Sequence, residues 1–274
     1  MSTRTHYPAG VPCWVDTLQS DPQAAMRFYG ELFGWEFAGP GVMPGDPSGE
    51  YFVARLHGHD VAGIGSQPAP ETPSSPVWNT YVSVSDADDA CRAVSSAGGA
   101  VLVAPFDATP AGRMAVASDP SGGTFCIWEA TERAGAQLIN APGAWAMSTL
   151  LTRDADGAKQ FYGDVFGWHS DTFAAGETSF TLWRMPGYVG GEPQQPVPRD
   201  VVGVMAPTSD DAFPADAPPH WSVDFWIGDA DAAAAKAQAL GGSIVVPPHS
   251  APGFRRCVLA DPQGATFSLS QLIG

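Results

Sequence analysis

The feature that most constrains this fold is a segment that occurs twice. The first copy, residues 21–35, reads DPQAAMRFYGELFGW, and the second, residues 154–168, reads DADGAKQFYGDVFGW. Both copies keep Asp, Phe-Tyr-Gly and Phe-Gly-Trp in the same register, without a gap. Self-similarity of this kind indicates a duplicated domain.

Each copy predicts an amphipathic helix. The apolar residues of the first copy fall on one helical face and are Ala25, Phe28, Tyr29, Leu32 and Phe33. Asp21 suits the N-cap, because its carboxylate can accept a backbone N–H of the first turn. Gly34 suits the end of the helix, because glycine tolerates positive φ.

Four βαβββ modules follow from the order of strand and helix patterns, and unlike modules alternate. We place them at about 10–66, 76–130, 143–206 and 219–274, which groups them into domains 1–132 and 133–274. The second and fourth modules close on Asp119-Pro120-Ser121-Gly122 and its counterpart Asp261-Pro262-Gln263-Gly264. Residues 39–49 are predicted as a loop, and Pro-rich linkers are predicted at 66–76, 186–198 and 206–219.

The charge of the chain limits its partners. A net charge of −16 with only 13 Lys and Arg leaves no basic surface for nucleic acid or an anionic membrane. No signal peptide and no run of eighteen apolar residues occurs, so we expect a cytoplasmic protein that does not span a membrane. Four cysteines without C-x-x-C spacing are expected to be reduced, buried thiols.

These motifs carry a family resemblance over nearly the whole chain. A strand, a capping Asp, a helix ending in Phe-Tyr-x-x-x-x-Gly-Trp, and a second module closing in Asp-Pro-x-Gly resemble the vicinal oxygen chelate superfamily of glyoxalases, bleomycin resistance proteins and extradiol dioxygenases. The tandem signature further resembles an actinobacterial glyoxalase-like or hydroxylase-like branch, with members in aromatic polyketide pathways. The resemblance implies an α+β fold of tandem domains, each a curved mixed sheet around a pocket. Members pair modules within or across domains, and both arrangements stay open.

The resemblance also locates the superfamily's metal ligands. Catalytic members hold a divalent metal with His, Gln or Glu on first and last strands of the modules. The corresponding positions here are Trp14, Asn79, Met147 and Ser222 on first strands, and Cys126 and Ser268 on last strands. These residues do not supply the imidazole and carboxylate donors that such a site needs. We therefore expect no metal and no other cofactor.

The side chains that line the pocket are expected to lie on the same sheet face as those positions, because successive side chains of a strand alternate between its two faces. The lining comprises Trp14, Asp16, Asn79, Tyr81, Cys126 and Trp128 in the first domain, and Met147, Thr149, Ser222, Asp224, Trp226 and Ser268 in the second. Asp16 and Asp224 are either general bases with a raised pKa or carboxylates tied to a neighbouring strand or an Arg. Trp14 and Trp128 either fill the pocket or stack on a ligand.

Other conspicuous side chains are interpreted as structural. Trp35 and Trp168 should pack beneath their helices, and Arg113 and Arg255 should form surface ion pairs. His57 and His59 fall in a predicted hairpin turn.

The sequence therefore predicts a metal-free, glyoxalase-like protein, a monomer or homodimer, that binds an apolar, aromatic or quinonoid small molecule for sequestration, resistance or an accessory biosynthetic role. One alternative is a metal-independent hydroxylase-like, lyase or isomerase enzyme that uses a pocket Asp. Others are a metal-dependent glyoxalase or dioxygenase and a purely structural interaction module.

Overall fold

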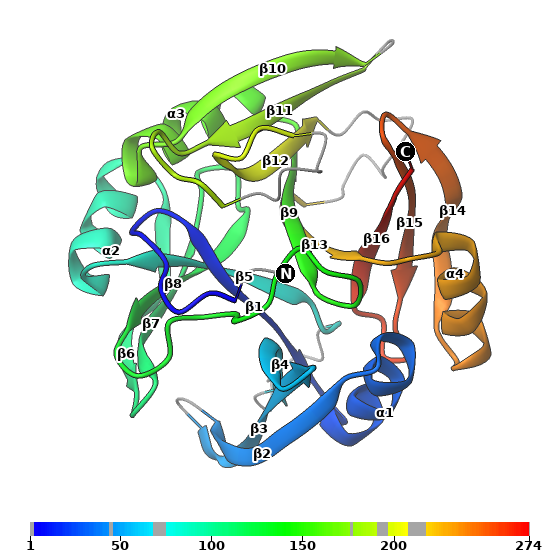
Figure 1. The fold of residues 1–274 in the computed structure, drawn as a ribbon. Coiled ribbons are helices and arrows are strands. Elements are labelled where there is room, and N and C mark those ends of the chain that lie inside the picture. Colours follow the sequence, from blue (N-terminus) through cyan, green and yellow to red (C-terminus); the bar gives the residue numbers. More distant parts are fainter. Residues whose placement is uncertain are drawn as a thin grey trace.

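The fold consists of two eight-stranded mixed sheets and four helices in the described ranges (Figure 1). The computed structural model describes residues 3–43, 46–67, 75–175, 178–190, 197–207 and 218–273. The strand orders are β2-β3-β4-β1-β5-β8-β7-β6 and β10-β11-β12-β9-β13-β16-β15-β14. The predicted α+β class with tandem domains is confirmed. Of the three predicted linkers, residues 68–74, 191–196 and 208–217 lie outside the described residues.

The two sheets are built from corresponding elements. The first contains β1 (Pro12–Gln19), β2 (Glu36–Met43), β3 (Asp46–Leu56), β4 (His59–Ser66), β5 (Trp78–Val84), β6 (Ala100–Ala108), β7 (Gly112–Ser118) and β8 (Thr124–Ala130). The second contains β9 (Trp145–Thr152), β10 (His169–Ala175), β11 (Thr178–Arg184), β12 (Val201–Pro207), β13 (His220–Trp226), β14 (Ser243–Ala251), β15 (Phe254–Ala260) and β16 (Thr266–Leu272). The helices are α1 (Pro22–Phe33), α2 (Ala87–Ser96), α3 (Ala155–Phe166) and α4 (Ala230–Ala239).

The repeated helix has the ends that the sequence predicts. The Asp21 carboxylate accepts a hydrogen bond from the Ala24 amide at 2.9 Å, and Gly34 ends α1 with φ 76°. Asp154 caps α3 in the same way, and Gly167 ends it with φ 71°. None of the four helices in the described segments has the length and apolar character needed to cross a membrane.

Neighbouring modules share a sheet, which decides the pairing that the sequence left open. In the first sheet β1 pairs parallel to β4 and β5 parallel to β8, and the two modules join where β1 pairs antiparallel to β5. The second sheet repeats this arrangement through β9 and β13.

The prediction of a loop at residues 39–49 was wrong, since most of this segment belongs to β2 and β3, and β10 was not predicted at all. Both β2 and β10 are edge strands whose side chains are largely exposed, so neither carries the alternation of apolar residues that marks a half-buried strand. In β2 the pairing with β3 is interrupted between Ala38 and Gly41, where a bulge accommodates Pro40.

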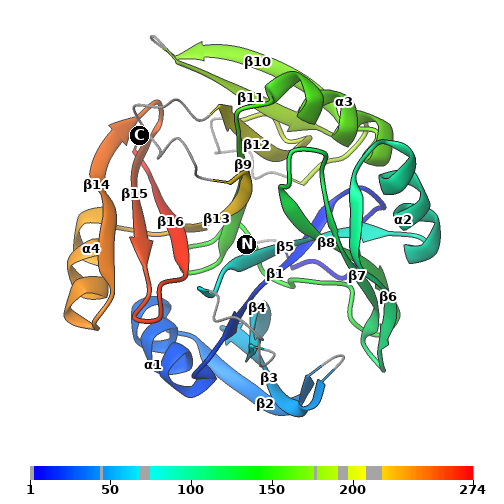
Figure 2. The ribbon, with the colours of Figure 1, turned by 180° about the vertical axis from the view of Figure 1, so that it is seen from behind.

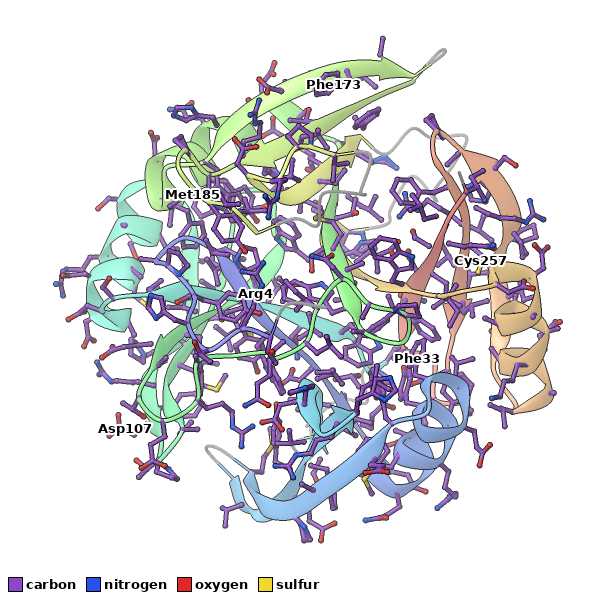
Figure 3. All side chains as sticks on the ribbon, viewed as in Figure 1. Arg4, Phe33, Asp107, Phe173, Met185 and Cys257 are labelled. Carbon is purple, nitrogen blue, oxygen red and sulfur yellow. The ribbon has the colours of Figure 1, made fainter. Side chains whose placement is uncertain are left out.

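The apolar face of α1 packs on the other domain. Phe33 lies with its ring centroid 4.9 Å from that of Phe225 on β13 and 6.1 Å from that of Phe267 on β16. Figures 1 and 2 show α1 beside the C-terminal strands and α2 beside α3, and Figure 3 shows Phe33 where α1 meets the C-terminal strands. The apolar face of the repeat therefore joins the two domains.

A buried hydrogen-bond chain reinforces this junction. The Tyr29 hydroxyl donates to Asp261 Oδ2 at 2.9 Å, and Trp78 Nε1 donates to the Tyr29 oxygen at 3.0 Å. Gln19 Nε2 also donates to Asp261 Oδ2, at 2.9 Å. The Tyr of the repeated helix thus binds the Asp-Pro turn of the opposite domain.

The duplication generates the same chain at the second junction. The Tyr162 hydroxyl donates to Asp119 Oδ2 at 3.1 Å, and Trp221 Nε1 donates to the Tyr162 oxygen at 2.9 Å. Tyr162 also packs against Phe125 of β8, with ring centroids 5.8 Å apart. At each of the two junctions, the repeated helix of one domain therefore binds the Asp-Pro turn of the other.

The tryptophans that end the repeat are buried, as their structural interpretation requires. Trp35 Nε1 donates to the Gly143 carbonyl at 2.7 Å, and Trp168 Nε1 donates to the Gly10 carbonyl at 2.6 Å. Both bonds join the Trp to a segment more than a hundred residues away, so these indoles contribute to the interdomain core.

Candidate functional site

The predicted lining residues of the first domain lie on one face of the first sheet. Trp14 pairs with Tyr81 and Asp16 with Asn79 across β1 and β5, and Tyr81 pairs with Cys126 of β8. Directly opposed residues project to the same face. We call this face, which carries Trp14, Asp16, Asn79, Tyr81, Cys126 and Trp128, the first concave face.

Asp16 is the polar centre of the first concave face. It is only 1% exposed, and it accepts hydrogen bonds from the Tyr81 hydroxyl at 2.7 Å, the Tyr51 hydroxyl at 2.9 Å and Asn79 Nδ2 at 2.9 Å. Burial raises the pKa of Asp16, and the three hydrogen bonds oppose that increase. The carboxylate is tied to its neighbouring strands, as one of the two interpretations of this residue proposed.

Tyr51 of β3 is a contributor that the sequence did not identify. Its hydroxyl donates to Asp16 and accepts a hydrogen bond from Trp14 Nε1 at 2.9 Å. The ring crosses β4 at Gly63, where an added Cβ would lie 1.9 Å from the Tyr51 oxygen. A glycine inside a strand is a signal of such a close approach, and Gly63 could have pointed to it.

The side chains of the first concave face fill much of their own space. Trp14, Tyr81, Cys126 and Trp128 are all buried, and Tyr81 and Trp128 make an edge-to-face contact with centroids 6.3 Å apart. Burial raises the pKa of the Cys126 thiol, so at neutral pH it is a thiol and not a nucleophilic thiolate. A ligand that donates to Asp16 would have to displace one of its three donors, Tyr51, Tyr81 or Asn79.

The raised pKa of Asp16 leads to a test of its protonation. The folded state binds the carboxyl proton of Asp16 more tightly than the unfolded chain does. The contribution of Asp16 to the free energy of unfolding is therefore favourable below the unfolded pKa of about 3.9 and is lost as pH rises through the folded-state pKa. Asp16→Asn removes this dependence while keeping an acceptor for the tyrosines. We expect the variant to gain stability over the wild type as pH rises, by about 1.4 kcal/mol for each unit of pKa increase.

Urea unfolding of both proteins at a series of pH values between acid and neutral measures this difference. The comparison cancels the contributions of the other carboxyl groups that the substitution leaves unchanged. A difference that does not vary with pH would show that Asp16 titrates alike in the folded and unfolded chains.

The predicted lining residues of the second domain also share a face. Met147 lies opposite Asp224, Thr149 opposite Ser222, and Asp224 pairs with Ser268 of β16. We call this face, which carries Met147, Thr149, Ser222, Asp224, Trp226 and Ser268, the second concave face. Its polar side chains are mostly hydroxyl groups, and its one predicted indole, Trp226, is half-buried.

Asp224 is held by two residues that were not predicted. Arg256 Nη2 and the Ser270 hydroxyl each donate to Asp224 Oδ2 at 2.8 Å, and Arg256 Nε donates to Ser270 Oγ at 3.1 Å. Asp224 is 3% exposed, and its Oδ1 is buried without a hydrogen-bond partner in the described structure. Among the described residues, the carboxylate is therefore paired through one oxygen only.

The arginines singled out in the sequence lie elsewhere. Arg113 pairs with Asp88 at the start of α2, and Arg255 pairs with Asp231 at the start of α4. Their interpretation as ion-pairing residues is confirmed. The side chain that reaches the second concave face belongs to the next residue, Arg256, because successive side chains of a strand alternate between faces.

Neither concave face offers donors that suit a divalent metal. On the first, the carboxylate oxygens of Asp16 are already engaged by Tyr51, Tyr81 and Asn79, and Cys126 is protonated. On the second, Asp224 is paired with an Arg. Within the described ranges no three His, Cys, Asp or Glu side chains converge on a common point. The residues present do not fit the superfamily's metal, and no chemical step is assigned to one.

A small cavity lies beside the second concave face. It measures about 40 Å³, and its lining includes Trp145, Ala146 and Met147 of β9 together with Tyr188 and Val201. This volume holds water but no metabolite. Of the predicted site residues, only Met147 borders it.

Two family models match the chain, one for each half. The model of the Glyoxalase/Bleomycin resistance protein/Dioxygenase superfamily matches residues 14–127, and that of the Glyoxalase-like domain matches residues 146–270. CFP32 of Mycobacterium tuberculosis, provisionally named a glyoxylase, is 40% identical over 98% of this chain and 97% of its own. The anthracycline biosynthesis protein DnrV of Streptomyces peucetius is 31% identical over 98% of this chain and 95% of its own.

Solved structures with the same fold include an Mn(II)-bound glyoxalase and a dioxygenase. The Mn(II)-bound glyoxalase of Novosphingobium aromaticivorans matches with a TM-score of 0.63 and 16% identity, over 96% of this chain and 82% of its own. The 2,3-dioxygenase LapB of Pseudomonas sp. KL28 matches with a TM-score of 0.61 and 11% identity, over 96% of this chain and 93% of its own. At these identities the likeness concerns the fold alone.

Proposed function

Because the chain belongs to the superfamily of glyoxalases, bleomycin resistance proteins and dioxygenases, we propose that it binds an apolar, aromatic or quinonoid small molecule without a divalent metal. The observation that carries this proposal is that the positions corresponding to the superfamily's metal ligands lack His and Glu on both concave faces, which carry aromatic, amide, thiol, thioether and hydroxyl side chains instead. Binding serves sequestration, resistance or an accessory step of biosynthesis. We further propose that the protein is cytoplasmic and works as a monomer or homodimer.

The chemistry of the two faces supports a flat, hydrophobic ligand. Tryptophan and tyrosine rings offer stacking surfaces, and a few fixed polar groups can orient a bound molecule. The relative DnrV is named for anthracycline biosynthesis, and anthracyclines are fused aromatic polyketides with a quinone ring. Its similarity over almost the full length of both chains favours a ligand of that kind here.

Titration with aromatic polyketides and quinones tests the proposal. Binding is expected to quench tryptophan fluorescence with saturation, because Trp14 and Trp128 lie on the first concave face and Trp226 on the second. A folded protein whose fluorescence and thermal stability respond to none of these compounds would contradict it. Aliphatic compounds of the same size serve as the control for nonspecific partition.

A second candidate function is a metal-independent hydroxylase-like, lyase or isomerase reaction. The raised pKa of Asp16 favours it, because a carboxylate with this property is a stronger base than a free one. Turnover that persists with a chelator and disappears in Asp16→Asn would support the enzyme. Turnover that the substitution leaves unchanged would exclude Asp16 as the base.

A metal-dependent glyoxalase or dioxygenase is the remaining alternative, since one solved structure with this fold is an Mn(II)-bound glyoxalase and another is a dioxygenase. The content of divalent metal in protein purified without a chelator, measured by elemental analysis, distinguishes this alternative from metal-free binding. One divalent ion bound per domain would overturn the metal-free proposal, whereas a substoichiometric content that dialysis removes would support it.

A further inference from the structure

We propose that the second concave face binds a hydroxyl group of the ligand at Asp224 Oδ1. The inference rests on the proposed function, since it specifies the polar group that an otherwise apolar ligand carries. It assigns the hydroxyl-recognising role to Asp224 with Arg256 and Ser270 as positioning residues.

The first observation that supports this site is that Asp224 Oδ1 accepts no hydrogen bond from the described residues. Asp224 Oδ2 accepts from Arg256 and from Ser270, both at 2.8 Å, whereas Oδ1 of the same carboxylate is buried and accepts from none of the described residues. A buried oxygen without a donor is costly, and a ligand donor that reached it would recover that cost. This half-satisfied carboxylate favours a ligand that brings its own proton.

The charge of the site selects the kind of donor. Arg256 already compensates the negative charge of Asp224 through the ion pair to Oδ2. A second cation, such as an ammonium group, would meet the guanidinium at close range and gain little. A neutral hydroxyl donates a hydrogen bond to Oδ1 without this repulsion.

The neighbouring side chains suit a hydroxylated ring. Ser268 lies beside Asp224 on β16, and its hydroxyl is 3.4 Å from that of Ser222, so both can donate to or accept from further ligand oxygens. Met147 lies directly opposite Asp224 on β9 and is half-buried. Its unbranched thioether can change rotamer, and a ligand would reach Oδ1 by displacing this side chain.

The first concave face provides an internal comparison. Both oxygens of Asp16 accept hydrogen bonds from the protein, Oδ1 from Asn79 and Oδ2 from Tyr51 and Tyr81. A ligand hydroxyl there would have to replace an existing bond, with little net gain. The difference between the two carboxylates assigns hydroxyl recognition to the second domain.

Naphthol and its methyl ether are the probes that test this inference. They share a ring system, but only naphthol can donate a hydrogen bond. Titration of the full-length wild type by fluorescence is expected to give a Kd for naphthol about tenfold to a hundredfold below that for the ether, as for a hydrogen bond to a charged acceptor. In Asp224→Asn the amide nitrogen can take the place of Oδ1, so the acceptor is lost and this ratio is expected to fall toward one.

Asp231→Asn is the matched control, because it also breaks an Asp–Arg pair of the second domain but lies at the start of α4. Its ratio of the two Kd values should equal that of the wild type. Should Asp224→Asn fail to fold, Met147→Ala carries the test and is expected to bind naphthol several-fold more tightly.

The outcomes separate this inference from the proposed function. Equal affinity of the wild type for naphthol and its ether, or an unchanged ratio in Asp224→Asn, would overturn hydroxyl recognition while leaving aromatic binding in place. An unchanged naphthol affinity in Met147→Ala would likewise place the ligand elsewhere. No binding of either probe by the folded wild type would contradict this inference and weaken the aromatic-ligand proposal together.

Discussion

Phe33→Ala is expected to lower the free energy of unfolding of the whole chain by about 3–5 kcal/mol, the cost of a large cavity in a packed aromatic core. Phe33 is 7% exposed and packs on Phe225 of the opposite domain and on Trp35 of its own, with centroids 4.9 Å away in both cases. Because the ring belongs to the junction of the domains, one cooperative transition should move to lower denaturant. Urea unfolding followed by fluorescence and by circular dichroism measures the shift.

Phe173→Ala is the matched control, because it removes the same side chain from an exposed place. Phe173 is 44% exposed on the edge strand β10 and stacks only on Phe180 among the described rings. Its loss should cost less than about 1 kcal/mol. If Phe33→Ala instead splits the unfolding into two transitions, with only one displaced, the domains unfold independently and the junction is not part of a common core.

Asp261→Ala is expected to destabilise the chain by about 3–5 kcal/mol, because one carboxylate accepts hydrogen bonds from four donors and all four bonds would be lost. Oδ2 accepts from Tyr29 and Gln19 of the first domain, both at 2.9 Å, and Oδ1 accepts from the amides of Gln263 and Ala265, also at 2.9 Å. The substitution therefore opens the Asp-Pro turn and the interdomain contact together. Thermal and urea unfolding measure the loss.

Two further variants calibrate this effect. Tyr29→Phe removes one donor and leaves the turn intact, so we expect a smaller loss of about 1–2 kcal/mol. Asp154→Ala removes the exposed N-cap of α3 and should cost about 1 kcal/mol. A loss in Asp261→Ala no greater than that in Asp154→Ala would contradict a role of the carboxylate in joining the domains.

Much of the fold could be predicted because local patterns encode it. The spacing of apolar residues, the capping Asp21 and the terminal Gly34 set the repeated helix, and the structure places that helix at residues 22–33. The alternation of side chains along each strand put Asp16 and Asn79 on one face of a sheet, where they form a hydrogen bond. Side chains alternate between the two faces of a strand, so the number of residues between two positions of a strand is enough to tell whether they share a face.

The edge strands and the completed polar sites could not be predicted in this way. β2 and β10 are mostly exposed, so burial left no pattern in their residues. Tyr51 reaches Asp16 from a strand 35 residues away, and Arg256 reaches Asp224 across 32 residues. Contacts of this kind depend on how strands are ordered in the sheet. The pattern of apolar and polar residues along the sequence does not determine that order.

The sequence alone determined that the chain is duplicated, which helices it forms and which residues share a sheet face. Only the tertiary structure decided that the apolar face of α1 packs on β13 and β16 of the other domain, that Tyr51 covers Asp16, and that one oxygen of Asp224 has no partner among the described residues. The physical reason is that an apolar stripe specifies a face to be buried but not the surface that buries it. That choice depends on contacts between Tyr29 and Asp261, 232 residues apart.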